Sequence, residues 1–244
     1  MIISTTGIVL YQSEYSETSL IIKAFTEQFG LQSYIVKGVR KKGARVKRNL
    51  FGPLSMIDLV AYGKENTGLH LIKEVSNHRQ FNTISGDITR SAVLLFMNEL
   101  LYRSIRGEMP DKKLFSFIYH SVVDLDTTEK SLALFPLRFA LQLAGFLGFD
   151  PQNNYSEECP FFDMLEGEFT EVCPTHPHYL EPQSGRLLSG LLDEDTVDII
   201  RIPDHKMRTA LLEKILEYYR LHLPAFGEMN SHHILSTVLQ DLEG

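Results

Sequence analysis

The chain has 244 residues, 43% of them apolar, a net charge of −7 and only two cysteines, Cys159 and Cys173. Two cysteines imply no disulfide framework and favour a reducing cytoplasm. The chain starts without a basic region ahead of its short apolar run, and no segment approaches the roughly 18 apolar residues of a membrane span. We therefore expect a cytoplasmic protein of one or two domains, with no secretion signal and no membrane partner.

The first 80 residues have the pattern of β-strands. Five short runs rich in Ile, Val, Leu and Tyr mostly alternate apolar with polar residues, and turn signals separate them: TGIVLYQ, SLIIKAFT, LQSYIVKGV, LSMIDLVAY and LHLIKEV. Five short antiparallel strands in about 80 residues predict a small closed barrel, because closure removes the unpaired edges. Residues 1–80 are therefore predicted to form a barrel of the oligonucleotide-binding (OB) type.

A basic segment interrupts this strand pattern. The sequence KGVRKKGARVKR holds seven cations and no acid in twelve residues, namely Lys37, Arg40, Lys41, Lys42, Arg45, Lys47 and Arg48. Residues 1–80 carry eleven Lys and Arg and six Asp and Glu, a net charge of +5, so the remainder carries −12. Such a concentrated basic segment in an acidic chain favours a polyanion, most often nucleic acid, although a solvated loop without a ligand would look the same.

Aromatic rings accompany the cations, as they do in OB-type sites where bases stack on rings beside a cationic groove. Seven rings lie in the same 80 residues, and alternation turns about half of them into the core. We take Tyr15 and Tyr34 as the candidate base contacts.

Helical periodicity follows from Ser85 onward, so residues 81–244 are predicted to form an α-helical domain, and the fold class is α+β. Asp87 or Ser85 is expected to cap the first helix. An irregular insert at about 151–189 holds five of the ten prolines. The predicted helices cover 88–105, 114–125, 131–149, 193–202, 205–223 and 231–242.

The insert carries a possible metal site. Its pattern is Cys-x13-Cys-x2-His-x-His, formed by Cys159, Cys173, His176 and His178. A structural zinc takes four ligands, usually in two close pairs, and only the second pair is present here. We expect a metal-free insert and no cofactor, with zinc as the alternative.

Enzyme signatures are absent: the sequence has no phosphate-binding glycine loop, no nucleotide-binding glycine motif, no H-E-x-x-H and no G-x-S-x-G. The acids at 193–195 and the pair His232-His233 stand at predicted helix starts, where capping and surface roles explain them. Two alternatives to nucleic-acid binding stay open. One is a metal-dependent enzyme that uses Cys159, Cys173 and His176, and the other is an adaptor whose basic segment meets an acidic protein.

The order of these features resembles the RecO family of bacterial recombination mediators. The likeness rests on the strands of the first domain, the Tyr15-Ser16-Glu17-Thr18 turn and the Lys-Gly-x-Arg start of the basic segment. It continues in PLRFALQLAGFLGFDP and in EYYRLHLPAFGEMNS. Many members carry two Cys-x-x-Cys pairs in the insert. The matching places here hold Cys159 with Phe162 and Cys173 with His176, so the zinc-finger-like insert is degenerate.

The resemblance implies a non-enzymatic role in DNA repair and recombination. It implies binding of single- and double-stranded DNA, annealing of complementary strands, and action with RecR in loading RecA onto DNA coated by single-stranded DNA-binding protein (SSB). It also implies a cytoplasmic, nucleoid-associated protein. In the family the acidic tail of SSB docks on the helical domain, and Arg138 matches the arginine of the helix motif, so it is the candidate partner of a tail carboxylate.

Overall fold

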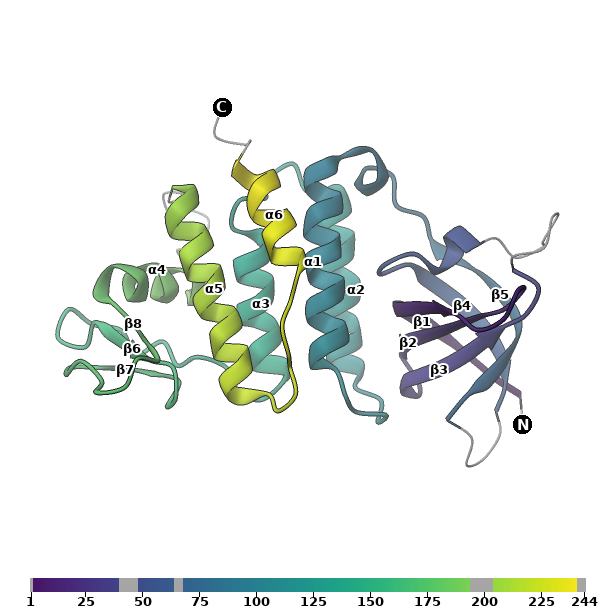
Figure 1. The fold of residues 1–244 in the computed structure, drawn as a ribbon, viewed down its shortest axis with the longest axis horizontal. Coiled ribbons are helices and arrows are strands. Elements are labelled where there is room, and N and C mark those ends of the chain that lie inside the picture. The colour runs from purple at the N-terminus through teal and green to yellow at the C-terminus, as the bar shows by residue number, and fades with distance from the viewer. Residues whose placement is uncertain (1, 40–47, 64–67, 194–203, 241–244) are drawn as a thin grey trace. The chain divides into compact units, whose positions relative to one another are not determined.

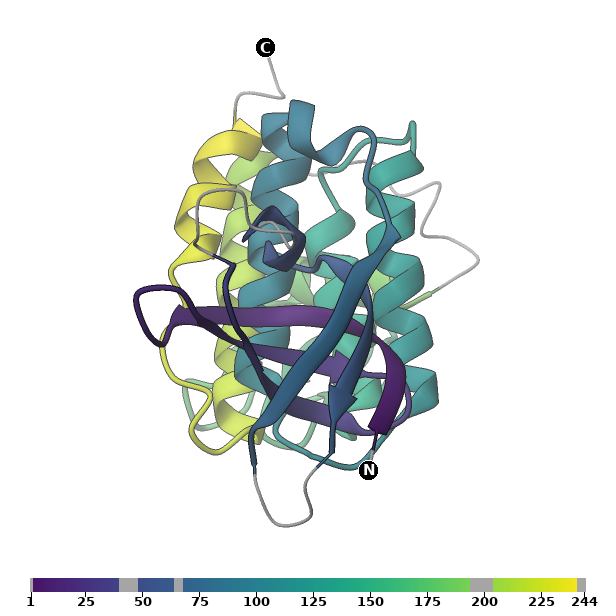
Figure 2. The same ribbon diagram turned by 90° about the vertical axis from the view of Figure 1, so that its right-hand side faces the viewer.

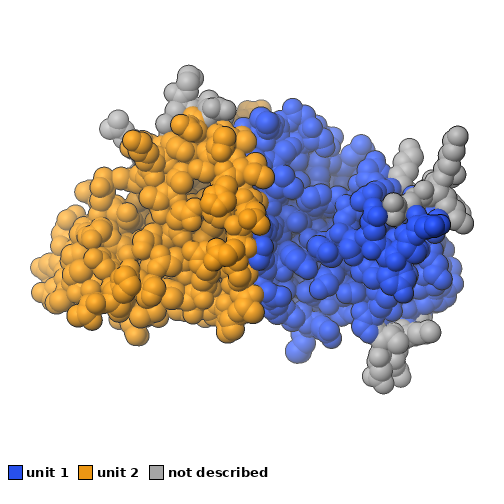
Figure 3. Space-filling view, in the orientation of Figure 1, with its two compact units in different colours: residues 1–128 blue, residues 129–244 orange. Residues whose placement is uncertain are grey.

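The computed structural model describes residues 2–39, 48–63, 68–193 and 204–240. The chain divides into two compact units, residues 1–128 and 129–244, which Figure 3 shows in different colours. The sequence places a boundary near residue 80, where strands give way to helices. By packing, the first unit also takes in two helices after the strands, so the division at residue 80 stays a prediction.

The first unit begins with a closed five-stranded barrel (Figures 1 and 2). Around the barrel the strands follow the order β1-β2-β3-β5-β4, and the predicted OB-type barrel is confirmed. One detail differs, because β3 and β5 pair in parallel through Tyr34 with His70 and Ile35 with Leu71. The strands are β1 (Ile2–Glu14), β2 (Leu20–Thr26), β3 (Gly30–Val36), β4 (Met56–Tyr62) and β5 (His70–Arg79).

Alternation of side chains forms the barrel core. On β2 the side chains of Leu20, Ile22 and Ala24 are fully buried, whereas Ile21 and Lys23 point outward and are half-buried. The short 3-10 helix η1 (Arg48–Phe51) adds the buried ring of Phe51 to the same core. The core thus draws on β-branched and aromatic residues of every strand and on the segment that precedes β4.

Strand β1 is long enough to pair with both of its neighbours and so to close the barrel. Its first half, from Ile2 to Ile8, pairs with β4, and its second half, from Gly7 to Glu14, pairs with β2. The register shifts between Val9 and Tyr11, and such a bulge bends a strand sharply.

Two helices complete the first unit, α1 (Ile88–Ser104) and α2 (Lys112–Thr127). Asp87 caps α1 by accepting hydrogen bonds from the backbone N–H groups of Thr89 and Arg90, at 2.8 and 3.1 Å, as the sequence predicts. The turn between β2 and β3 lies against the chain that joins the helices. At Gly30, where φ is 67°, a β-carbon would lie 2.5 Å from the carbonyl oxygens of Glu108 and Met109.

Asp126 of α2 anchors the connection between barrel and helices. Its side chain is 1% exposed and accepts hydrogen bonds from the backbone N–H groups of Asn82, Thr83 and Ile84 at 2.9–3.1 Å. Ile84 begins the short 3-10 helix η2 (Ile84–Gly86). Burial opposes ionisation of this carboxyl, but the backbone donors outweigh burial and lower the pKa of Asp126 below its ordinary value.

The second unit packs its helices around two buried tyrosines. The Tyr219 hydroxyl donates to the carbonyl of Ala140 at 2.7 Å, and the Tyr218 hydroxyl donates to that of Phe149 at 2.9 Å. Burial raises the pKa of both hydroxyls. The helices are α3 (Phe135–Phe146), α4 (Pro182–Leu192), α5 (His205–His222) and α6 (Ser231–Gln240).

The insert is more regular than its sequence suggests. It contains a three-stranded antiparallel sheet in the order β7-β6-β8, formed by β6 (Phe161–Asp163), β7 (Glu168–Thr170) and β8 (Tyr179–Leu180). Its last part, predicted to be irregular up to residue 189, is the start of α4. The predicted helix at 193–202 falls almost wholly outside the described residues. Among the helices of the described part, none combines the length and apolar character needed to cross a membrane.

We expect the substitution Asp126→Asn to lower the free energy of unfolding by about 1–3 kcal/mol near neutral pH, because an amide cannot replace a charged acceptor of several N–H groups. The pKa is lowered in the fold, so the stabilisation is present above the unfolded value of 3.8 and is lost as pH falls through the lower folded value. Denaturant unfolding measured across this range should show the difference shrinking in acid. Asp124→Asn, at an exposed position of the same helix, is the control. A difference that does not change with pH would contradict the assignment.

Candidate nucleic-acid interface

The strand register places the end of β1, the start of β2 and the end of β3 at the same end of their sheet. Glu14 pairs with Leu20, and Leu20 pairs with Val36, so the ends of β1 and β3 stand two strand spacings apart, about 10 Å. The turn after Glu14 and the residues after Val36 therefore lie close together. Tyr15 and Lys37 each follow directly on one of these strand ends.

An ion pair brings the far end of the basic segment to the same place. Arg48 Nη1 lies 3.3 Å from Glu14 Oε1, and both side chains are about half exposed. Arg48 begins η1, whose Phe51 is anchored in the barrel core. The two described ends of the basic segment are thus fixed beside the turn between β1 and β2.

The described candidates at this site face solvent. Lys37 is exposed, and the Tyr15 side chain is 59% exposed at the turn. In this neighbourhood the described cations Lys37 and Arg48 are matched by the exposed acids Glu14 and Glu17. Five further predicted contacts lie outside the described residues: Arg40, Lys41, Lys42, Arg45 and Lys47.

The prediction for Tyr34 is wrong. Its side chain is fully buried in the barrel core, with its ring centroid 5.7 Å from that of His70. Burial raises the pKa of its hydroxyl to about 12. On β3 the alternation turns Tyr34 and Val36 inward and Ile35 outward. A ring in this position supports the barrel and offers no face to a ligand.

A group of three outward side chains was missed by sequence reasoning. Tyr11 of β1 stacks on Tyr102 of α1 with ring centroids 4.9 Å apart and planes 12° apart. Lys23 of β2 places its Nζ 5.7 Å from the centroid of the Tyr102 ring. Tyr11 pairs in register with Lys23 and is 41% exposed, so the outer surface of the sheet offers a ring and a cation together. Tyr11 is one of the seven rings counted in the first 80 residues, but it was not singled out, and nothing in the strand pattern pointed to Lys23 or Tyr102.

The cysteine and histidine candidates of the insert do not form one cluster among the described residues. Cys159 is half-buried and Cys173 is exposed, and neither forms a disulfide. Of the described His, Cys, Asp and Glu residues, these four are not brought together as a group of metal ligands. The metal-free insert stays a prediction, with zinc as its alternative.

Carboxylates hold the two histidines of the insert instead. His176 Nε2 lies 3.1 Å from Asp163 Oδ2, and His178 Nδ1 lies 2.7 Å from Glu217 Oε1 on α5. Glu217 also accepts from Lys214 at 3.0 Å. Burial opposes ionisation of Glu217, but these two partners outweigh it and lower its pKa. His176 thus makes a contact within the insert, to the last residue of β6, and His178 links the insert to α5.

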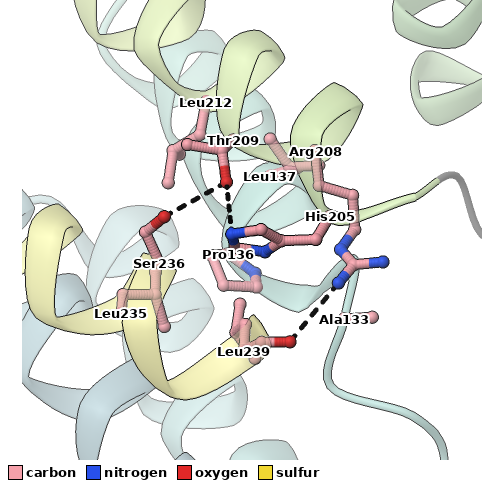
Figure 4. A pocket seen from close by; sticks show the side chains of 10 residues that line it. All are labelled: Ala133, Pro136, Leu137, His205, Arg208, Thr209, Leu212, Leu235, Ser236 and Leu239. Carbon is pink, nitrogen blue, oxygen red and sulfur yellow. Dashed lines mark hydrogen bonds between the residues drawn. The ribbon is translucent and has the colours of Figure 1, made fainter. Parts of the chain in front are cut away.

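The candidate partner residue Arg138 lies half-buried on α3. Its neighbours Pro136 and Leu137 line a small hollow between α3, α5 and α6 (Figure 4), and Arg138 itself does not line it. Arg208 of α5 does, and its Nη2 donates to the carbonyl of Leu239 at 3.4 Å. The remaining lining is mostly aliphatic.

Comparison with known proteins finds family matches over most of the chain. Residues 1–81 match the family described as recombination protein O N terminal, and residues 85–230 match recombination protein O C terminal. The "DNA repair protein RecO" of Bacteroides fragilis is 39% identical over 96% of this chain and 98% of its own length. The proteins of the same name from Phocaeicola vulgatus and Flavobacterium johnsoniae are 34% and 32% identical, over 96% and 98% of this chain and 98% and 99% of their own lengths.

The N-terminal match spans the barrel of this chain and the C-terminal match spans most of its helices, and the family that both matches name agrees with the expectation of a non-enzymatic role in DNA repair. The chain therefore belongs to the RecO family of recombination and DNA repair proteins.

Proposed function

We propose that this recombination mediator binds single- and double-stranded DNA through the end of the barrel where Tyr15, Lys37 and Arg48 meet. Two observations support the proposal most: the register places the ends of β1 and β3 about 10 Å apart, and the ion pair holds Arg48 at Glu14, the last residue of β1. Arg40, Lys41, Lys42, Arg45 and Lys47 are joined to this place through Val39 on one side and Arg48 on the other. Seven cations on one short segment suit a phosphate backbone.

The energetics follow from charge neutralisation. If the site contacts about four to six phosphates of a single strand, affinity should fall by roughly one and a half to three decades between about 50 and 200 mM salt. Phosphate contacts carry no base information, and stacking on Tyr15 or Tyr11 accepts any base. Binding with a strong salt dependence and little sequence preference is therefore expected.

Annealing and partner binding complete the proposal. Two strands whose phosphates are neutralised on one protein repel each other less, so complementary strands would pair without ATP. In this role the protein would work with RecR in the cytoplasm, at the nucleoid, to help load RecA onto SSB-coated DNA. Arg138 is proposed to pair with a carboxylate of the acidic SSB tail. The nearby hollow is open to solvent and its volume of about 20 Å³ has room for little more than one water molecule, so such a tail would lie over its mouth.

We predict that replacing Lys37, Lys41, Lys42 and Lys47 by Gln flattens the dependence of log affinity on log salt by up to about three units for single-stranded DNA, since each lost phosphate contact removes about 0.7. Titration of labelled oligonucleotide at several salt concentrations measures this slope. A control variant removes the same charge from Lys112, Lys113, Lys130 and Lys206, which are exposed elsewhere. Equal slopes for the two variants would refute the proposed site.

We predict that Glu14→Gln tightens binding of single-stranded DNA by up to about fivefold at low salt. The substitution frees Arg48 from an exposed ion pair of the kind worth about 0–1 kcal/mol, and it removes a charge that repels phosphate. Glu129→Gln, an exposed acid of the second unit, should leave the affinity unchanged. Weaker binding by Glu14→Gln would show that the ion pair organises the site instead of competing with DNA.

We predict that Tyr15→Ala weakens single-strand binding by about 1–3 kcal/mol while the salt slope stays constant, because stacking on a ring involves no counterion release. Tyr15→Phe keeps the ring and should bind as the parent does. The same titrations measure both variants. A changed slope, or an equal loss in Tyr15→Phe, would assign Tyr15 a role other than stacking.

A further inference from the structure

Three potential metal ligands meet where α5 and α6 pack together. Glu213 of α5 and the neighbouring residues His232 and His233 of α6 each offer one ligand atom, and these atoms all lie within 4.8 Å of one another. The closest pair is His232 Nε2 and Glu213 Oε1, at 3.1 Å. This group is separate from the insert and from the proposed DNA site.

The burial of His232 corrects the sequence-based interpretation of the histidine pair. Both histidines were expected at the surface of a helix start, yet His232 is 5% exposed, while His233 is exposed. The two rings nevertheless stay close, with centroids 3.9 Å apart. One ligand is therefore fixed by packing, and the Glu213 and His233 side chains stand beside it at the edge of the solvent.

The spacing fits a tetrahedral ion. Zinc lies about 2.0–2.2 Å from imidazole nitrogen and carboxylate oxygen, so two such ligands on one tetrahedral ion are about 3.4 Å apart. The separation of 3.1 Å between His232 and Glu213 is already close to that value. The ligand atom of His233 lies within 4.8 Å of the other two, and its exposed side chain has room to turn toward them.

We propose that Glu213, His232 and His233 form a binding site for one divalent transition-metal ion of the zinc type. Two imidazoles and one carboxylate bind zinc in preference to calcium or magnesium. Three protein ligands also leave the fourth position of a tetrahedral ion free for water. Because the ligands come from two helices, the ion would fasten α6 to α5. The competing explanation is an ion pair between Glu213 and His232 alone, in which His233 takes no part.

The test uses the full-length, tag-free chain, treated with chelator and dialysed, and titrated with Zn²⁺ in a calorimeter near neutral pH. A Cys159→Ser, Cys173→Ser background removes any contribution of the insert. We expect one ion per chain in the parent and in this background, and affinity reduced by more than about tenfold in His233→Ala and in Glu213→Gln. His120→Ala, which removes an exposed histidine from α2, is the matched control and should bind as the parent does.

A second measurement locates the ion. Amide hydrogen exchange of residues 231–240 should slow on addition of Zn²⁺ in the parent and stay unchanged in His233→Ala, whose exposed position keeps the fold intact. The proposal is overturned if no ion binds, if binding depends on the cysteines, if His233→Ala binds as tightly as His120→Ala, or if the exchange of α6 does not respond.

Discussion

The double pairing of β1 is the constraint on which the first unit depends. One strand gives its first half to β4 and its second half to β2, and the shift in register between Val9 and Tyr11 allows the bend between the halves. Closure gives β1 a partner strand on both sides, and it also fixes where β1 ends. Since Glu14, Leu20 and Val36 are in register, the position of the proposed DNA site is a consequence of how the barrel closes.

Hydrophobic burial does most to hold the described ends of the basic segment in place. The described ends of the segment are held by hydrophobic burial of Phe51 and by one exposed ion pair, while Lys37 remains exposed. Residues 81–244 carry a net charge of −12, which opposes indiscriminate attachment to polyanions. In the proposed function, attraction to DNA would thus be confined to one end of a small barrel.

Much of this arrangement could be predicted from the sequence, because local patterns record local structure. The five strand runs, the cap at Asp87 and the basic segment were readable from periodicity and composition. The parallel pairing of β3 with β5 was not, since it joins residues 36 positions apart and leaves no local signal. Tyr34 and His232 were misjudged because the face that a side chain presents depends on what packs there. Helix α4 was missed, since its Pro, Ser and Gly residues favour turns over helices.

The ion pair between Glu14 and Arg48 has a kinetic meaning. A carboxylate tethered beside the guanidinium is always present at high local concentration, so in the proposed site it would recapture Arg48 as soon as a phosphate leaves. Release of a strand then becomes the exchange of one anion for another, with no bare charge left behind. In the proposed function the protein brings strands together and afterwards yields them to other factors, so a short residence time would be useful, and a built-in competitor for Arg48 would shorten it.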